Sequence, residues 1–278
     1  MLVIDCNGGL GNRIRSLCSG LYLAEAAELP FVILWPRNPR CDAFYTDLFD
    51  PIALVFDQEV VDLLPSYSGL VSLLHEPYQE YLLSNTSPRE FSCLEQILEF
   101  FDSHKSSTIL FSENNFLAFM SEKDKKKSAA RIRFNQEIRL RFDRVLATFP
   151  KSFYGVHLRG TDFPSSAPIR EIYQLIESNR NASFFVCSDE YLIERQLAHF
   201  ENVCIHEKKH YVQKIGPGNW NTPVDVQGIG YSSNVFRSGE SLIEACVDLL
   251  LLSRSEIINT SASSFLDIAR FLKPDGNG

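Results

Sequence analysis

Short apolar runs alternate with segments of helical spacing along most of the chain. Runs rich in Val, Ile, Leu and Phe predict strands, and apolar residues that recur every three or four positions predict the helices between them. The predicted strands span residues 2–5, 31–35, 108–111, 153–158, 183–187, 202–206 and 256–260. The clearest predicted helices span residues 12–28, 128–146, 169–178, 190–200, 241–253 and 264–272. This alternation predicts an α/β fold of parallel sheets with helices on both faces, and ligand sites at the carboxyl ends of the strands.

Two α/β domains are expected, because a second strand–helix series begins soon after Pro150. That proline ends the helical pattern over 128–146, which places the domain boundary near 148–152. We therefore predict two Rossmann-like domains, 1–150 and 151–278, that face each other across a cleft, a common place for a ligand site.

Composition narrows the classes of partner. The chain has 278 residues, 45% of them hydrophobic, and a formal net charge of −8. This excess of acid argues against nucleic acid as a partner, because such binders concentrate Lys and Arg on the contacting face. Nine Lys and Arg residues cluster over 123–144. We interpret them as the solvated face of a helix, with binding of an anionic acceptor as the alternative.

The sequence also predicts a cytoplasmic protein without a membrane span. Its seven cysteines form no C-x-x-C pair, which favours reduced thiols in a reducing compartment. The N-terminus reads directly as a strand rather than as a signal region. The longest apolar stretch, over 247–252 and interrupted by Asp248, is far short of the roughly 20 residues that cross a bilayer. A further segment, 208–239, is rich in Gly, Pro, Asn and Ser and predicts a long irregular loop.

The first candidate motif is the glycine-rich turn Gly8-Gly-Leu-Gly-Asn-Arg13, which follows the first predicted strand. Glycines there permit close backbone approach, and the N–H groups of a helix start attract anions or polar ligands. The run lacks the ending of a P-loop, and Ile14 stands where a dinucleotide fingerprint has its third glycine. A tight turn alone would explain the glycines, whereas Asn12 and Arg13 favour a binding role.

The second motif, His157-Leu-Arg-Gly-Thr-Asp162, ends the strongest strand of the second half. An imidazole, a guanidinium, a hydroxyl and a carboxylate lie there where an α/β fold presents ligand-binding side chains. Arg159 suits a diphosphate, because a guanidinium bonds two oxygens at once and stays charged. The alternative is an Arg–Asp pair that only ties the loop down.

Two more motifs follow predicted strands. In Cys187-Ser-Asp-Glu190, Asp189 is either the N-cap of the next helix or an acceptor for a nucleobase or ribose. Asn259-Thr-Ser-Ala-Ser-Ser-Phe265 precedes the last predicted helix. Ser263 or Ser264 can cap that helix, and the same hydroxyls with the free N–H groups make an anion site.

One further pattern, His206-Glu-Lys-Lys-His210, matches the H-E-x-x-H zinc motif. That chemistry requires a helix with both imidazoles on one face and a third ligand beyond it. Here the first histidine ends a strand pattern and a Gly/Pro-rich loop follows, so a zinc hydrolase is a disfavoured hypothesis.

The order and placement of the four other motifs resemble the fucosyltransferase superfamily. The resemblance covers 8–13 and, more continuously, 153–269, whereas 36–150 matches no family. His157-Leu-Arg-Gly-Thr-Asp162 with Pro168-Ile-Arg-Glu-Ile-Tyr173 is similar to the α1,6-fucosyltransferase and nodulation protein Z branch. The run 242–253 followed by Ser261-Ala-Ser-Ser-Phe265 resembles the closing motif of the α1,2-, α1,6- and protein O-fucosyltransferases.

This resemblance implies a GT-B-like fold, a GDP-fucose donor, a saccharide acceptor, inversion at the sugar carbon and no metal requirement. It implies that Arg159 binds the diphosphate and stabilises charge on the departing GDP, and that Asp189 contacts the nucleoside. The other residues implied at the donor are His157, Ser263, Ser264, Phe265, Asn12 and Gly11. The attacking hydroxyl needs a proton acceptor, for which Asp162 and Glu190 are the candidates.

One position departs from the pattern. The α1,6 enzymes have a second arginine directly after the first, and here that position is Gly160. The departure weakens any expectation of the same acceptor or linkage. It also motivates an alternative function, a non-catalytic protein that binds a sugar nucleotide or a carbohydrate on the same scaffold.

Overall fold

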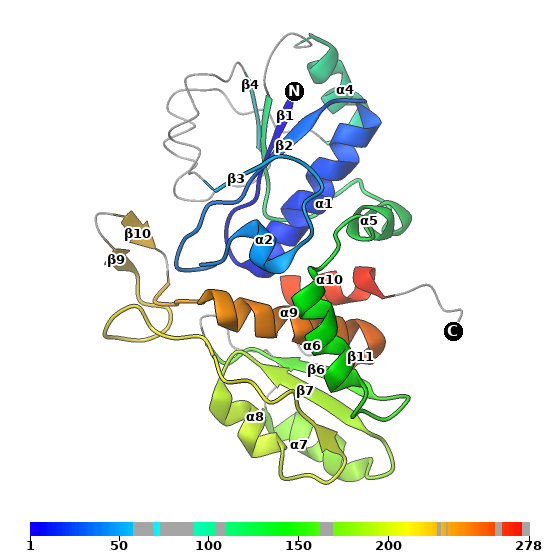
Figure 1. The fold of residues 1–278 in the computed structure, drawn as a ribbon, viewed down its shortest axis with the longest axis vertical. Coiled ribbons are helices and arrows are strands. Elements are labelled where there is room, and N and C mark those ends of the chain that lie inside the picture. The colour runs from blue at the N-terminus through cyan, green and yellow to red at the C-terminus, as the bar shows by residue number, and fades with distance from the viewer. Residues whose placement is uncertain are drawn as a thin grey trace. The chain divides into compact units, whose positions relative to one another are not determined.

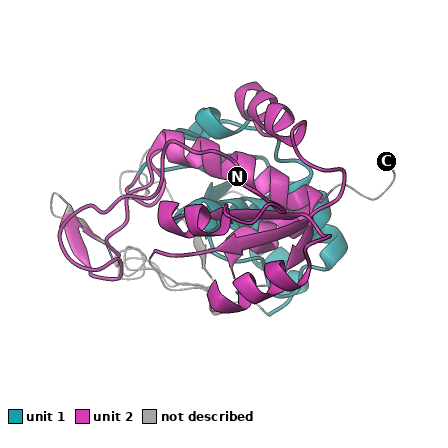
Figure 2. Ribbon diagram, turned by 90° about the horizontal axis from the view of Figure 1, so that it is seen from below, with its two compact units in different colours: residues 1–37, 44–133 teal, residues 38–43, 134–278 magenta. Residues whose placement is uncertain are grey.

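The chain folds into two compact units, which Figure 2 distinguishes by colour. The computed structural model describes residues 1–57, 69–72, 92–103, 109–161, 169–226, 229–231, 233–258 and 263–273. Unit 1 comprises residues 1–37 and 44–133, and unit 2 comprises residues 38–43 and 134–278. The division thus falls after residue 133 rather than near 148–152, because helix α6 (Gln136–Leu146) packs against α9 (Gly239–Arg254) of unit 2.

Unit 1 is built on a parallel five-stranded sheet with the order β3-β2-β1-β5-β4. Its strands are β1 (Leu2–Asp5), β2 (Phe31–Leu34), β3 (Val55–Phe56), β4 (Gly69–Ser72) and β5 (Ile109–Ser112). Its helices are α1 (Leu10–Ala26), α2 (Tyr45–Leu48), α4 (Leu94–Ser103) and α5 (Glu122–Ala129). The chain runs outward from β1 on one side and returns on the other through β5. The carboxyl end of β1 therefore lies at the topological switch point, where such sheets bind ligands.

Helix α1 packs directly on β1 because Gly20 has no side chain. A Cβ atom there would lie 2.6 Å from Cγ1 of Ile4 on β1, far inside contact distance. The hydroxyl of Ser16 also donates to the carbonyl oxygen of Asp5 at 2.8 Å. These two contacts fix the start of α1 relative to the end of β1, and so fix the glycine-rich turn between them.

Unit 2 is built on a parallel four-stranded sheet with the order β11-β6-β7-β8 (Figure 1). Its strands are β6 (Tyr154–Leu158), β7 (Phe184–Ser188), β8 (Val203–Cys204) and β11 (Glu256–Ile258). The remaining helices are α7 (Ile169–Ser178), α8 (Tyr191–Leu197), α9 and α10 (Ser264–Leu272). Here too the order reverses, between β6 and β11, so a second switch point lies at their carboxyl ends. Every predicted strand overlaps an observed strand.

The two faces of the unit 2 sheet carry different chemistry. On one face Val156, Leu158, Phe184 and Val186 form an apolar core with residues of α7 and α8. The opposite face of β6 carries Gly155 and His157 and is covered by α9 (Figure 1). The candidate residue His157 therefore lies on the face opposite this apolar core.

The continuous helix predicted over 128–146 is wrong. Helix α5 ends at Ala129, and α6 begins at Gln136 with Asn135 as its N-cap. The Asn135 side chain accepts a hydrogen bond from the Ile138 backbone N–H at 3.0 Å. A capping asparagine satisfies a free N–H of a new helix, which favours a start there over continuation of the old one.

The irregular loop predicted over 208–239 is ordered in part. It contains an antiparallel hairpin of β9 (Val224–Val226) and β10 (Ile229–Tyr231). Nearby, the fully buried Asn234 accepts from the Gly216 N–H and donates to the Gly216 carbonyl, both at 2.8 Å. A single side chain thus replaces the backbone partners that a sheet would supply. Among the described residues, no helix is long and apolar enough to cross a membrane.

Gly155 offers a test of the close contact between β6 and the end of α9. A Cβ atom at this position would lie 2.0 Å from Oγ of Ser255. We expect Gly155→Ala to lower the free energy of unfolding by about 1–3 kcal/mol, the usual cost of overpacking. Urea denaturation measures this, with Gly216→Ala as the control, because a Cβ atom at Gly216 meets nothing within 4 Å. Equal stability of the two variants would contradict the contact.

Candidate functional site

The glycine-rich turn of unit 1 lies at the carboxyl end of β1. Gly8 has φ +81°, a conformation that favours glycine, and Gly9 is the N-cap of α1 without a side-chain cap. A Cβ atom at Gly8 would lie 3.3 Å from Nδ2 of Asn12 and 3.4 Å from Oδ1 of Asn114. The Asn12 amide and the Asn114 amide therefore both lie close to Gly8, which places polar groups beside the start of α1.

Arg13 supports this turn from inside the unit. Its side chain is fully buried, its Nε donates to the Gly8 carbonyl at 2.8 Å, and its guanidinium lies 5.0 Å from the ring centre of Trp35. A guanidinium over an indole face is a favourable cation–π contact. Arg13 is thus a structural residue of the turn, and of the two residues that favoured a binding role only Asn12 is partly exposed.

In unit 2, candidate residues from three strand ends lie on neighbouring strands. His157 lies at the end of β6, Asp189 directly follows β7, and Ser263 and Phe265 lie at the start of α10, which follows β11. The imidazole of His157 stacks on the Phe265 ring, with centroids 4.9 Å apart and planes at 29°. Ser263 is the N-cap of α10, since its hydroxyl accepts from the Phe265 N–H. This stack joins β6 to α10 across the switch point of the sheet.

His157 is held in its neutral form. Burial lowers its pKa to about 4, and the positive charges of Arg159 and Lys208 act in the same direction against the carboxylates of Asp189 and Asp248. Above this pH the ring carries no charge. A neutral imidazole can donate one hydrogen bond and accept another, and it can stack on an aromatic ring without the cost of burying a charge.

Asp189 ties the turn after β6 to the end of β7. Its Oδ1 accepts from the Gly160 N–H at 2.8 Å, and its Oδ2 accepts from the Thr161 hydroxyl at 2.5 Å. Nε of Arg159 lies 3.8 Å from the same Oδ2. The N-cap of α8 is Glu190 rather than Asp189. Arg159 thus lies close to Asp189, whereas Asp162, the aspartate of its own motif, lies outside the described residues.

Gly160 allows the turn to lie against the start of α8. A Cβ atom at this position would come within 2.4 Å of Oε2 of Glu190 and 2.5 Å of Cδ1 of Ile193. Any larger residue would displace both side chains. Glu190 therefore lies beside the turn that carries Arg159, and burial together with the charge of Asp189 raises the pKa of this glutamate.

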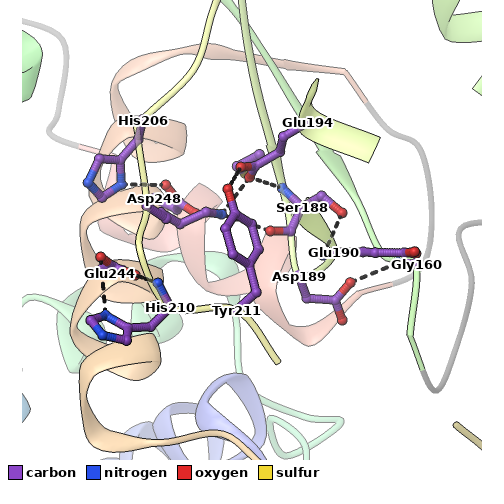
Figure 3. Close-up of polar contacts among 12 residues, drawn as sticks. Gly160, Ser188, Asp189, Glu190, Glu194, His206, His210, Tyr211, Glu244 and Asp248 are labelled. Atoms are coloured by element: carbon purple, nitrogen blue, oxygen red, sulfur yellow. Dashed lines mark hydrogen bonds and ion pairs between the residues drawn. The ribbon is translucent and has the colours of Figure 1, made fainter. Parts of the chain in front are cut away.

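A buried polar network lies behind Asp189 (Figure 3). Glu194 of α8 accepts from the Ser188 N–H at 2.6 Å and from the Tyr211 hydroxyl at 2.6 Å. Lys208 forms ion pairs with Glu194 at 2.5 Å and with Asp248 of α9 at 2.6 Å. The network thus connects α8, α9 and the segment that follows β8.

The H-E-x-x-H pattern belongs to this network and is not helical. Nδ1 of His206 lies 2.9 Å from Oδ1 of Asp248, whereas Nδ1 of His210 lies 3.6 Å from Oε1 of Glu244, one helical turn away on α9 (Figure 3). The two imidazoles thus contact two different carboxylates. Within the described part of the chain, no three His, Cys, Asp or Glu side chains are grouped as metal ligands.

Several residues of these sites were missed by sequence reasoning. Asn114 follows β5, and its position beside Gly8 depends on the pairing of β1 with β5. Lys208 lies within the H-E-x-x-H pattern but is neither of its histidines nor its glutamate, and Glu194 lies on a helix without a recognisable motif. A polar residue after a predicted strand was a usable signal for Asn114, but none existed for the pairing of Lys208 with two distant acids. Asp162 lies outside the described residues, and the roles predicted for the other site residues stay predictions.

These features define a class of fold: two parallel α/β sheets, each with polar residues at its switch point. No protein-family model matches the chain, and no curated protein matches it.

The fold is similar to that of solved fucosyltransferase structures, and the similarity extends over nearly the whole chain. The chain is similar to NodZ α-1,6-fucosyltransferase co-crystallized with GDP, with 19% identity, a TM-score of 0.62, and coverage of 98% of this chain and 92% of that one. It is also similar to POFUT1 in complex with GDP-fucose, with 15% identity, a TM-score of 0.54, and coverage of 97% and 93%. These likenesses show that the chain shares the fold of these fucosyltransferase structures.

The buried His157 predicts a specific dependence of stability on pH. Its pKa is about 4 in the folded protein and near 6.5 in the unfolded chain. Between these values the unfolded state binds the extra proton, so stability falls as the pH falls through 6.5 towards 4. From pH 7 to pH 5 this residue should account for a loss of about 2 kcal/mol.

Urea denaturation of the wild type and of His157→Gln at both pH values measures this effect. The variant should lose about 2 kcal/mol less than the wild type over that interval. His199→Gln, which changes an exposed histidine of the same unit, controls for the loss of a histidine as such. An identical pH dependence in wild type and His157→Gln would contradict the buried neutral ring.

Proposed function

We propose that the protein is a glycosyltransferase that transfers fucose from GDP-fucose to a saccharide acceptor, with inversion and without a metal ion. The observation that carries the proposal is the arrangement in unit 2, where Arg159, Asp189, His157 and the start of α10 share one switch point. The fold likeness adds to this, because the similar structures include complexes with GDP and GDP-fucose.

In this proposal the diphosphate binds between Arg159 and the start of α10. The Arg159 side chain is 25% exposed, so its guanidinium remains accessible although Nε faces Asp189. The first N–H groups of a helix form an anion site, and that of Ser264 is in the first turn of α10, whereas the Phe265 N–H donates to the Ser263 hydroxyl. Together they supply positive potential where negative charge develops on departing GDP, without a metal ion.

The other proposed contacts to the donor follow from placing the diphosphate between Arg159 and the start of α10. We assign the nucleoside to the side of Asp189, whose carboxylate has acceptor positions beyond those used by Gly160 and Thr161. His157, stacked on Phe265, orients the start of α10 at the phosphates. Asn12 and Gly11 of unit 1 would contact the donor sugar, and unit 1 would provide the acceptor side.

The attacking hydroxyl loses a proton, for which we propose Asp162 or Glu190 as the acceptor. Glu190 lies beside the Arg159 turn, and its raised pKa makes its carboxylate a stronger base. The bond to the leaving group breaks ahead of attack in an oxocarbenium-like transition state, so this base contributes less than the stabilisation of GDP.

Arg159 tests the function directly. We expect Arg159→Ala to weaken GDP binding at least tenfold in isothermal titration and to reduce fucose transfer about 10²-fold or more, because one charged donor to the leaving group is lost. Arg159→Lys should recover part of this, since it keeps the charge but not the two-pronged contact. Arg180→Ala, at an exposed arginine after α7, is the control.

Two results would contradict the proposal. One is a wild-type protein that does not bind GDP, and the other is an Arg159→Ala variant with unchanged transfer. Titration with GDP-fucose against GDP-mannose tests the donor sugar separately. GDP binding without transfer or donor hydrolysis across an acceptor panel would identify a non-catalytic binding protein instead.

The proposed base is tested with Asp162→Asn and Glu190→Gln. Loss of the base should lower kcat while GDP affinity stays within about threefold of wild type, because the base contacts the acceptor rather than the nucleotide. If Glu190 is the base, its raised pKa moves the acidic limb of the kcat profile above the usual range of a glutamate, and Glu190→Gln abolishes that limb. Full activity of both variants would exclude both residues.

A further inference from the structure

Lys208 is a buried cation at the end of β7. Its side chain is 5% exposed, and its ammonium group reaches Glu194, Asp248 and the carbonyl oxygen of Ser188, the last at 2.7 Å. Burial alone would lower the pKa of this amine, but the two carboxylates raise it above its usual value, so the group stays charged. Lys208 therefore uses all three of its donors on groups from three different segments.

The network binds both backbone polar groups of Ser188, the last residue of β7. The Ser188 N–H donates to Glu194, and the Ser188 carbonyl accepts from Lys208. The Ser188 hydroxyl also accepts from the Glu190 N–H at 3.1 Å. Hydrogen bonds to charged groups are about twice as strong as neutral ones. The chain entering and leaving Asp189 is thus held on both sides.

Asp189 transmits this position to the turn after β6. Its carboxylate holds the Gly160 N–H (Figure 3) and the Thr161 hydroxyl, and its Oδ2 lies 3.8 Å from Nε of Arg159. A shift of Ser188 would therefore move Asp189 and, through it, the backbone that carries Arg159. Lys208 is bonded to Ser188 rather than to this turn, so its effect on the turn is indirect.

Such a network is a poor way to gain stability. Taking Lys208, Glu194 and Asp248 out of water costs several kcal/mol for each charge, and apolar residues of similar volume would fold at least as well. What charged groups provide and apolar groups do not is directional bonding to one backbone position. The cost of burying these charges therefore indicates that the position of the backbone at the end of β7 matters.

From these contacts we propose that Lys208 is a positioning residue for the donor site: by fixing Ser188 and hence Asp189, it sets the place of the Gly160 turn and of Arg159. For the identity of the ligand this inference rests on the proposed function. The position of the turn does not depend on that identity.

The experiment uses a variant that keeps the buried charges balanced. Lys208→Met alone leaves two buried carboxylates with one fewer cation and risks misfolding. Lys208→Met/Glu194→Gln removes one positive and one negative charge together. Asp248 then keeps His206 as its partner, and the side-chain oxygen of the glutamine introduced on α8 can still accept from the Ser188 N–H.

Two control variants distinguish an effect on the position of the Gly160 turn from an effect on stability or on net charge. Lys209→Met removes an exposed neighbouring cation. Ile176→Ala lowers stability by about 2–5 kcal/mol in the apolar core on the opposite face of the sheet. Both variants should keep the wild-type geometry of the Gly160 turn.

The readouts are hydrogen exchange of the Gly160 amide and titration with GDP, both well below the unfolding temperature. For the double variant we expect faster exchange at Gly160 and at least tenfold weaker GDP binding, whereas both controls match the wild type. Wild-type exchange and affinity in a folded double variant would overturn the inference, as would equal effects in Ile176→Ala.

The experiment distinguishes a failure of the proposed function from a failure of the inference about Lys208. If the wild type does not bind GDP, the exchange measurement alone decides the role of Lys208. If the double variant does not fold, the single variant Glu194→Gln, which only weakens the anchor of Lys208, gives the same readouts: faster Gly160 exchange supports the inference, and wild-type exchange overturns it.

Discussion

The carboxylate of Asp189 is the contact on which the candidate site of unit 2 depends. It joins the ends of the two central strands, β6 and β7, because it binds the Gly160 N–H and the Thr161 hydroxyl from beyond its own strand. Parallel strands bring their carboxyl ends to one edge, but they leave the loops that follow without backbone partners. Asp189 supplies those partners, and in doing so it orients the turn that carries Arg159.

Small residues make this arrangement possible on both sides of β6. Gly155 lets the end of α9 approach the strand, and Gly160 lets the turn lie against Glu190 and Ile193 of the next segment. The α1,6 enzymes have a second arginine at this position. Here the position is Gly160, and the side chains of Glu190 and Ile193 pack closely against it. In the proposed reaction, leaving-group stabilisation would therefore depend on Arg159 and the start of α10 rather than on paired arginines.

The acidic balance of the chain is compatible with an anion site because the positive potential is local. The net charge of −8 is spread over the whole sequence, whereas Arg159 and the first N–H groups of α10 are at one strand edge. Nearby carboxylates are already engaged: Asp189 holds the turn, and Glu194 and Asp248 share Lys208. Engaged carboxylates oppose a diphosphate less than free ones would.

Much of the fold was predictable from the sequence, since the strands β1, β6 and β7 are apolar runs and α7 and α10 begin and end where their spacing predicts. Local sequence patterns predicted the wrong helix bounds where a capping residue interrupts an apolar pattern, as Asn135 does before α6. The cap at Ser263 was predictable, because capping depends only on neighbours along the chain.

Contacts between distant segments were not predictable. The pairing of Lys208 with Asp248 joins residues whose spacing carries no pattern, and Asn234 orders the Gly216 loop in the same way. Asp189 was found as a candidate, but its bonds to Gly160 and Thr161 depend on the register of β6 with β7. The motifs thus indicated candidate residues, whereas the hydrogen bonds between those residues depend on the fold.

The central claim, that the switch point of unit 2 binds a sugar nucleotide, is tested most directly by a crystal structure of the complex with GDP. The account predicts the diphosphate at the Arg159 guanidinium and the Ser264 N–H at the start of α10, with the guanosine on the side of Asp189. GDP bound away from Arg159 and α10, or bound only at the glycine-rich turn of unit 1, would contradict it.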